Sequence, residues 1–167
     1  DMDDIHLQMG VCPQDDALWA SLTGPEHLEF YGRLKNLKGK ELRQEIDFWL
    51  EQVNLHSDKT RVKASSEYSG GMKRRLSVAC AMIGNPSVVL MDEPTTGLDP
   101  ASRIALWHVV RKFKSQCAMM LTTHSMEEAE ALCDRLGIFV AGRLKTVGHA
   151  SELKERYGRF YKIQMTT

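Results

Sequence analysis

Apolar residues recur at helical spacing in the first half of the chain. Leu28, Tyr31 and Leu34 lie three residues apart and predict a helix over residues 25–37. Residues 40–55 carry a second apolar helical face, and a third helix follows residues 69–71 and extends to about residue 83. Residues 56–68 are polar and predict a loop, whereas a mixed run over residues 5–13 ends in a strand-like segment stopped by proline.

The second half alternates between strand-like and helical patterns. Residues 88–91 form a continuous apolar run, typical of a strand that is covered on both faces, and residues 118–122 predict a second strand. Helices are predicted over residues 100–114, with Asp99 as N-cap, and over residues 125–133, where Ser125 and Glu128 form a capping box. A hairpin (136–140 and 144–147), a helix (150–157) and a strand (160–165) follow. The pattern predicts an α/β fold with a mainly parallel sheet and a helical insertion.

Composition excludes several classes of protein. The 167 residues carry 22 Lys and Arg against 22 Asp and Glu, so the chain lacks the basic field of a nucleic-acid binder. No apolar run approaches the roughly 20 residues that span a bilayer. The four cysteines are far apart, without paired spacing or neighbouring histidines, which argues against a zinc site. We therefore expect no nucleic-acid partner, no zinc and no membrane span in these residues.

The strongest chemical feature is the pair Asp92 and Glu93, which follows the apolar run of residues 88–91 directly. A parallel strand delivers such residues to the carboxyl edge of its sheet, where ligands bind. Asp92 is suited to hold Mg²⁺ directly or through water, and Glu93 to position or deprotonate an attacking water. The alternative is a solvated strand end followed by a turn.

A hydroxyl and two glycines, Ser69, Gly70 and Gly71, open the third helix before Met72. Free N–H groups and the positive end of the helix dipole can hold a phosphate there, although an ordinary N-cap explains the pattern equally well. The cations at residues 73–75 oppose the dipole, so we expect them to face a partner or solvent. Alone, His124 after the strand of residues 118–122 and Gln14 after Pro13 are more typical of structural residues.

The order of these motifs resembles the nucleotide-binding domain of ATP-binding cassette (ABC) proteins from its glutamine loop onward, over essentially the whole chain. The resemblance implies a P-loop NTPase-like mainly parallel sheet with a helical subdomain, which binds ATP and Mg²⁺. It also implies site roles: Gln14 as the glutamine-loop residue, acting in catalysis and on Mg²⁺; Ser69, Gly70, Gly71 and Met72 in the nucleotide-binding signature motif; Asp92 as the Walker B Mg²⁺ ligand; Glu93 as the catalytic glutamate; Asp99 as the D-loop residue; and His124 as the catalytic switch histidine.

Tyr68 and Met72 depart from the commoner signature, Leu-Ser-Gly-Gly-Gln. Together with the sequences of residues 68–75 and 121–130, this departure is similar to subfamily A, the lipid-transporter branch. Residues 31–35 and 100–103 are most similar to plant members. The resemblance implies transport of a lipid or another hydrophobic compound.

One part of the family pattern is missing from these residues. No Gly-x-x-x-x-Gly-Lys-Ser/Thr motif occurs, so the Walker A cradle for phosphates is absent and the fold is expected to be incomplete at the N-terminus. Because phosphoryl transfer depends on holding the phosphates, we expect negligible ATP hydrolysis by this chain alone. The start at Asp1 also favours a piece of a longer protein.

The resemblance divides the chain into an insertion with the signature helix (15–85), a core from Walker B to the hairpin (86–149) and a terminal helix and strand (150–167). It implies two partners, a second nucleotide-binding domain in a head-to-tail dimer and the transmembrane domains, which place the chain at the cytoplasmic face of a membrane. Trp19 and Leu22 are candidates for the membrane-domain contact, with core packing as the alternative.

Two other functions are open. The chain could be a non-hydrolysing regulator that donates its signature motif in trans, or a soluble cassette ATPase. A chromosomal type would need a long coiled coil, and only 55 positions separate Gln14 from Ser69.

Overall fold

A capping residue fixes where the first of the three predicted helices begins. In the computed structural model, which describes residues 2–158, helix α2 (Gly24–Leu34) starts after Thr23. The Thr23 hydroxyl accepts a hydrogen bond from the Glu26 N–H, and the Glu26 carboxylate accepts one from the Thr23 N–H at 2.7 Å. Helices α3 (Gly39–Gln52) and α5 (Gly70–Met82) match the other two helical patterns. The three helices predicted for this half are confirmed.

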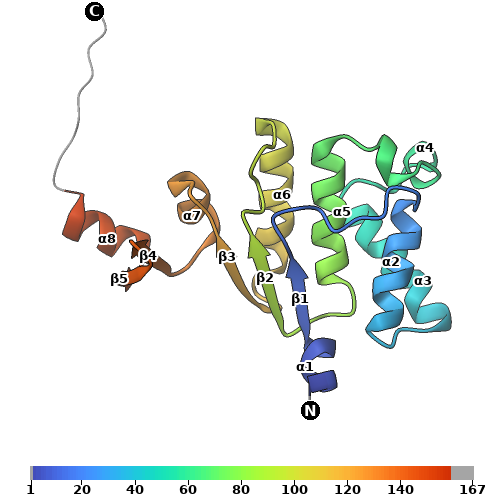
Figure 1. The fold of residues 1–167 in the computed structure, drawn as a ribbon, viewed down its shortest axis with the longest axis horizontal. Helices are drawn as coiled ribbons and strands as arrows, with labels where there is room; N and C mark the ends of the chain where they lie inside the picture. Colours follow the sequence, from blue (N-terminus) through green and yellow to red (C-terminus); the bar gives the residue numbers. More distant parts are fainter. Residues whose placement is uncertain (1, 159–167) are drawn as a thin grey trace, which may run out of the picture. The chain divides into compact units, whose positions relative to one another are not determined.

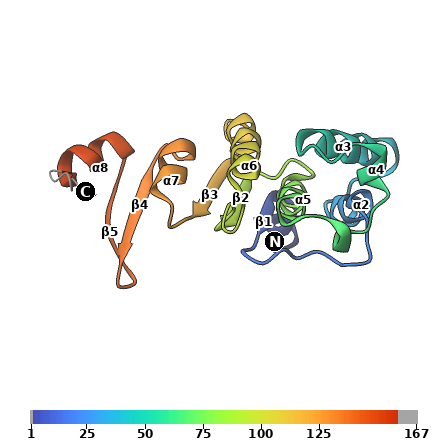
Figure 2. The same ribbon diagram turned by 90° about the horizontal axis from the view of Figure 1, so that it is seen from above.

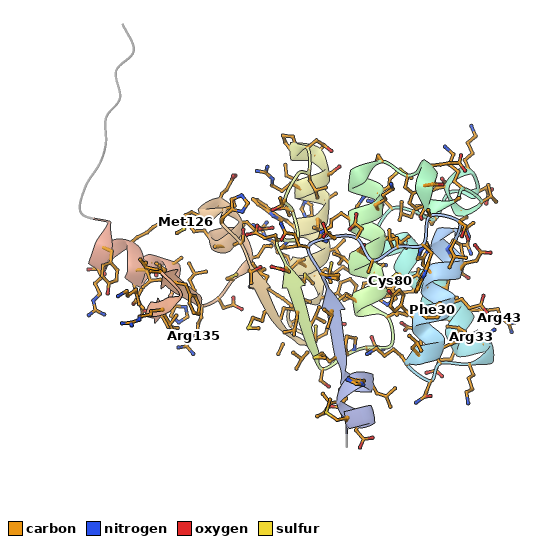
Figure 3. The ribbon with its side chains drawn as sticks, in the orientation of Figure 1. Phe30, Arg33, Arg43, Cys80, Met126 and Arg135 are labelled. Atoms are coloured by element: carbon orange, nitrogen blue, oxygen red, sulfur yellow. The ribbon has the colours of Figure 1, made fainter. Side chains whose placement is uncertain are left out.

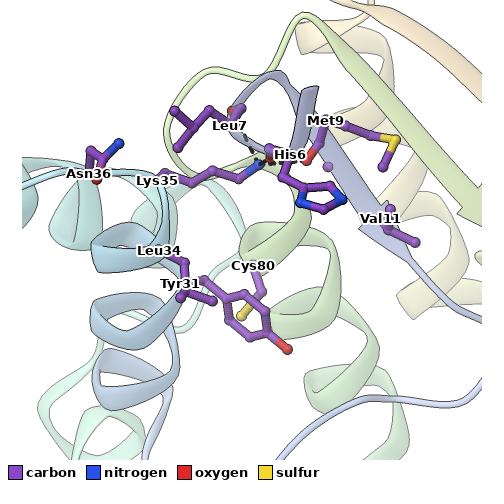
Figure 4. Close-up of a pocket in the computed structure, with 10 residues that line it drawn as sticks. His6, Leu7, Met9, Val11, Tyr31, Leu34, Lys35, Asn36 and Cys80 are labelled. Atoms are coloured by element: carbon purple, nitrogen blue, oxygen red, sulfur yellow. Dashed lines mark hydrogen bonds between the residues drawn. The ribbon is translucent and has the colours of Figure 1, made fainter. Parts of the chain in front are cut away.

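Two stretches of the first half differ from expectation. Helix α1 (Met2–Gln8) occupies the mixed run before the first strand, and the loop of residues 56–68 contains helix α4 (Asp58–Arg61) and the 3₁₀ turn η1 (Ser65–Glu67). Lys35 explains the first difference, because its Nζ reaches from beyond α2 to the carbonyl oxygens of His6 and Leu7 in the last turn of α1 (Figure 4). Such a distant cap leaves no local sequence signal.

Lys35 also donates to the Met9 carbonyl at 2.5 Å, and its side chain lies in a pocket of about 670 Å³. Burial lowers the pKa of Lys35 below its ordinary value. Tyr31, Leu34 and Cys80 are among the residues that line the pocket, which lies at the Met9 end of the first strand (Figure 4). None of the site residues predicted from the sequence lines it.

Three parallel strands form the sheet of the first compact unit, Asp1–His124. They are β1 (Met9–Cys12), β2 (Val88–Asp92) and β3 (Ala118–Thr122), in the order β1-β2-β3 (Figure 1). The register pairs Cys12 with Met91 and Asp92 with Thr122. All three strands therefore point their carboxyl ends to one edge, and the predicted parallel α/β arrangement is confirmed.

The two faces of this sheet differ in burial. Gly10, Cys12, Val89 and Met91 are buried on the face against which α5 packs. On the opposite face Val11, Val88 and Met120 are 51%, 40% and 63% exposed. The expectation that residues 88–91 are covered on both faces is wrong for the described part of the chain, because no described helix of Asp1–His124 buries these side chains.

Helices α2, α3 and α5 pack together beside the strands (Figure 2). Leu28 of α2, Leu50 of α3 and Leu76 of α5 are fully buried, which accounts for the apolar spacing of these helices. Trp49 of α3 packs against Phe113 at the end of α6 (Pro100–Phe113), with ring centroids 4.7 Å apart. The helical insertion is thereby joined to the helix that follows β2.

The second compact unit, Ser125–Thr167, contains helix α7 (Met126–Leu132), strands β4 (Leu136–Val140) and β5 (Arg143–Gly148) and helix α8 (Ala150–Tyr157). The strands form the predicted antiparallel hairpin, with positive φ at Ala141 and Gly142 in its turn. The Ser125 hydroxyl accepts from the Glu128 N–H at 3.3 Å, as expected for its N-cap. The predicted strand over residues 160–165 lies outside the described residues.

Candidate functional site

Two acidic residues stand at the carboxyl edge of the sheet, as the sequence predicts. Asp92 ends β2, and the Thr122 hydroxyl at the end of β3 donates a short hydrogen bond to its carboxylate. The same hydroxyl accepts from the Glu93 N–H at 3.1 Å, and the Thr122 carbonyl accepts from that N–H at 3.2 Å. One threonine thus orients both acids.

Glu93 adopts a left-handed backbone conformation, with φ of 46°, that turns the chain sharply after the strand. Its Oε2 accepts hydrogen bonds from His124 Nδ1 at 2.8 Å and from the Thr96 hydroxyl at 2.9 Å. Desolvation raises the pKa of Glu93, but the bonds from His124 and Thr96 outweigh it and hold that pKa below its ordinary value. Glu93 is therefore an ionised carboxylate at neutral pH, with an exposed histidine beside it.

Ser69 caps α5, and its hydroxyl accepts from the Met72 N–H at 3.3 Å. Asp99 caps α6 in the same way and accepts from the N–H groups of Ala101 and Ser102 at 3.0 Å. Hydrogen bonds from the Ser102 hydroxyl and then from backbone N–H groups lower the pKa of Asp99.

The two helix starts lie close together. A Cβ on Gly71 would overlap the Ser102 hydroxyl, and it would lie 3.9 Å from an Asp99 carboxylate oxygen. Gly70 has no heavy atom within 4 Å of where its Cβ would stand. Ser69, Gly70 and Asp99 are exposed at this contact, whereas Gly71 is buried in it. The open backbone at Ser69 and Gly70 is where a phosphate can approach the helix start.

Gln14 is exposed, and its carbonyl oxygen accepts from Arg74 Nη1 at 3.1 Å. Arg74 also donates to the carbonyl oxygens of Asp92 and Glu93, at 2.6 and 3.1 Å. Arg74 therefore binds the backbone of two segments with one guanidinium. One is the loop after β1 (residues 13–16, the Gln14 loop), and the other is the turn around Glu93 (residues 92–94, the Glu93 turn). The site divides into an acidic group around Glu93, tied in this way to Gln14, and the two helix starts at Ser69 and Asp99.

Two basic residues of α5 do not lie where the sequence predicts. The expectation that residues 73–75 face a partner or solvent is wrong for Arg74, which is 4% exposed, and for Arg75, which donates to the Val53 carbonyl at 2.6 Å. A usable signal exists, because Arg74 lies on the helical face of Gly71 and Val78, which are buried. Thr96 and Thr122 were also missed, since an isolated threonine carries no spacing that marks it.

The donors at the carboxyl edge fit a Mg²⁺ ion that shares its ligands with a nucleotide. Among residues 2–158, no group of three or more His, Cys, Asp or Glu side chains is arranged to hold a metal by itself. Mg²⁺ in nucleotide sites takes one or two carboxylates together with waters and phosphate oxygens. The exposed Asp92 carboxylate, already oriented by Thr122, offers such a ligand.

Comparison with known proteins identifies a family. The family described as ABC transporter matches residues 1–96. ABC transporter A family members 4 and 3 of Arabidopsis thaliana are each 62% identical over all 167 residues, and the chain spans 18% of their length. Member 6 of the same plant is 60% identical over the same span.

A solved structure described as an ATP-binding subunit of an ABC transporter superposes with a TM-score of 0.80 at 26% identity, covering 94% of this chain and 65% of that one. Its similarity agrees with the parallel α/β arrangement of β1, β2 and β3. No helix of residues 2–158 has both the length and the apolar character needed to cross a membrane. Sequence, fold and relatives together show that this chain belongs to the ABC transporter family, in subfamily A, and forms part of its ATP-binding domain.

Proposed function

We propose that the chain is part of the module that hydrolyses ATP to drive transport of a lipid or another hydrophobic compound. The observation that carries the proposal is the Glu93–His124 pair, held 2.8 Å apart beside Asp92 at the carboxyl edge of the sheet. An ionised carboxylate next to a metal-binding carboxylate is the arrangement needed to activate a water near a terminal phosphate. The plant relatives of subfamily A support the transport role.

Each site residue takes a part in this proposal. Glu93 orients and deprotonates the attacking water, and His124 holds the carboxylate in place. Asp92 and Gln14 would hold Mg²⁺, which when bound neutralises charge on the phosphates. The start of α5 and Asp99 would bind ATP held by a second nucleotide-binding domain, because the backbone at Gly70 is open. The cradle for the phosphates of the chain's own ATP comes from outside these 167 residues.

The hydrolysis proposal predicts a difference between the segment and a complete transporter that carries it. The complete protein is expected to hydrolyse ATP with Mg²⁺ and to lose that activity when EDTA removes the metal. The 167-residue chain alone is expected to show no rate above the enzyme-free background, since its sequence contains no Walker A motif to hold the phosphates of its own ATP. Phosphate release by both preparations, at equal molar concentration, measures this. EDTA-insensitive hydrolysis by the complete protein would contradict the metal role.

The membrane-domain contact is proposed for an aromatic surface after the Gln14 loop. Trp19 and Phe30 stack edge to face with centroids 4.7 Å apart, yet remain 45% and 42% exposed. Figure 3 shows Phe30 among the side chains of α2. Tyr31 packs against both of them, and its hydroxyl donates to the Ala17 carbonyl at 3.3 Å. Exposed, rigid aromatic side chains are typical anchors of protein interfaces. Leu22 is half-buried and fits core packing better.

This contact predicts protection of Phe30 in a complete transporter. A Phe30→Cys thiol is expected to react with a maleimide roughly tenfold more slowly than a Val62→Cys thiol, because the partner covers the aromatic surface. Val62 is the matched control, since it is 77% exposed and lies outside the aromatic cluster. The native cysteines Cys12 and Cys80 are buried, but Cys117 and Cys133 are partly exposed. Both variants are therefore made in a protein in which Cys117 and Cys133 are replaced by Ser. Equal labelling rates at the two positions would rule out the proposed contact.

A further inference from the structure

Arg74 is a buried cation in the middle of the site. It lies on α5, two residues after Met72, and only 4% of its surface is exposed. Burying a guanidinium is costly unless its N–H groups are bonded, so the partners of this side chain define what it does. The one carboxylate among them is that of Asp16, at 3.4 Å.

The other partners are backbone carbonyl oxygens from two separate loops. Two belong to the segment after β1, and three to the last residue of β2 and the turn that follows it. They are Pro13 at 2.5 Å and Gln14 at 3.1 Å, then Asp92 at 2.6 Å, Glu93 at 3.1 Å and Pro94 at 2.8 Å. Nη1 donates to the Gln14 loop, while Nη2 and Nε donate to the Glu93 turn. Only the planar fork of arginine presents donors in both directions at once.

The turn that Arg74 binds is the strained part of the site. Glu93 is held at φ 46°, a conformation that a residue with a long side chain adopts at a cost. Arg74 binds the carbonyl oxygens of Glu93 and of both its neighbours, and so stabilises this conformation. The same conformation directs the Glu93 carboxylate to His124 and Thr96.

The Gln14 loop is tied to the same helix by a second contact. Asp16 Oδ1 accepts from the Ser77 hydroxyl at 2.9 Å as well as from Arg74 Nη1. Arg74 and Ser77 lie three residues apart on one face of α5, so two successive turns of this helix bind the loop through Asp16. The loop therefore cannot shift against α5 without breaking bonds to a buried charge.

We infer that Arg74 is a positioning residue that fixes the Glu93 turn and the Gln14 loop to the helix of the signature motif. The inference rests on the proposed ATP hydrolysis and adds a coupling device to it. Arg74 does not touch ATP or water in this scheme. It acts through backbone carbonyl groups, so that the catalytic carboxylate, the Gln14 loop and the start of α5 keep one relative position.

The test compares Arg74→Lys and Arg74→Gln with wild type in a complete transporter carrying this segment. We expect kcat for ATP hydrolysis to fall at least tenfold in both variants, while KM for ATP changes less than twofold, because nucleotide contacts are untouched. Lysine is expected not to rescue, since its single ammonium cannot serve both loops. Asp16→Asn, which weakens only the contact with the Gln14 loop and keeps the five carbonyl bonds, is expected to lower kcat by a smaller factor.

Lys35→Met is the matched control. Lys35 is also a partly buried cation bound to carbonyl oxygens, but at the opposite end of β1 from Gln14. The Lys35→Met variant is expected to have lower thermal stability, while its kcat per folded molecule stays unchanged. Wild-type kcat in Arg74→Lys, or a loss of kcat in Lys35→Met as large as in the Arg74 variants, would overturn the positioning role. The Glu93→Gln variant separates the two proposals: if it retains ATP hydrolysis, the proposed function itself fails.

Discussion

Replacing Glu93 by Gln in a complete transporter that carries this segment is expected to lower kcat for ATP hydrolysis by about 10²–10⁴-fold, the range for loss of a general base. Glutamine keeps the size of the side chain and an oxygen that can still accept from His124 or Thr96. It removes the negative charge that attracts a proton from water. Because Asp92 and the start of α5 are unchanged, ATP affinity should stay within a few-fold. Phosphate release and nucleotide binding, measured on one preparation, give both quantities.

His124→Ala is the variant to compare with Glu93→Gln. It keeps the Glu93 carboxylate and removes the imidazole whose Nδ1 lies 2.8 Å from Glu93 Oε2. Hydrogen bonding and charge from His124 help to hold the pKa of Glu93 below its ordinary value, against the opposing effect of desolvation. Without His124 that pKa rises, so the acidic limb of the pH–rate profile should move to higher pH, and kcat should fall by roughly tenfold. A full rate in Glu93→Gln at every pH would show that Glu93 is not the base.

Local patterns predicted the elements of the fold well, because each pattern has a local cause. The β2 strand follows from four consecutive apolar residues, and α6 follows from Asp99 as N-cap with Pro100 at the first helical position. The order of short motifs predicted where the acidic pair and His124 lie. The structure brings the pair and the histidine together because β2 and β3 are adjacent and parallel.

What the sequence could not predict depends on tertiary contacts. Arg74 and Lys35 are both bound to carbonyl oxygens far away in the chain, so neither has a local partner that a pattern could show. A cation in the first turns of a helix is unfavourable by its dipole alone, which led to the wrong expectation of exposure. The bonds of Arg74 to five carbonyl oxygens override that local effect.

The largest loss of stability is expected for Gly10→Ala in β1. The backbone of α5 lies so close to Gly10 that an added Cβ would overlap the Ala81 carbonyl oxygen and stand 2.9 Å from the Ala81 carbonyl carbon. Both atoms belong to a backbone within a buried helix, so neither can move aside as a flexible side chain would. We expect a cost of about 3 kcal/mol or more, at the upper end of overpacking substitutions. Urea unfolding of the complete nucleotide-binding domain measures it.

Gly70→Ala is the matched substitution for this experiment, because the same methyl group meets no heavy atom within 4 Å at the start of α5. Alanine there reduces the freedom of the unfolded chain, so stability should rise by about 0.5–1 kcal/mol or stay unchanged. Gly10→Ala should also lower ATP hydrolysis, since moving α5 away from β1 displaces Arg74 from the Gln14 loop and the Glu93 turn. Equal unfolding midpoints for the two variants would mean that α5 does not pack on β1 as closely as the structure shows.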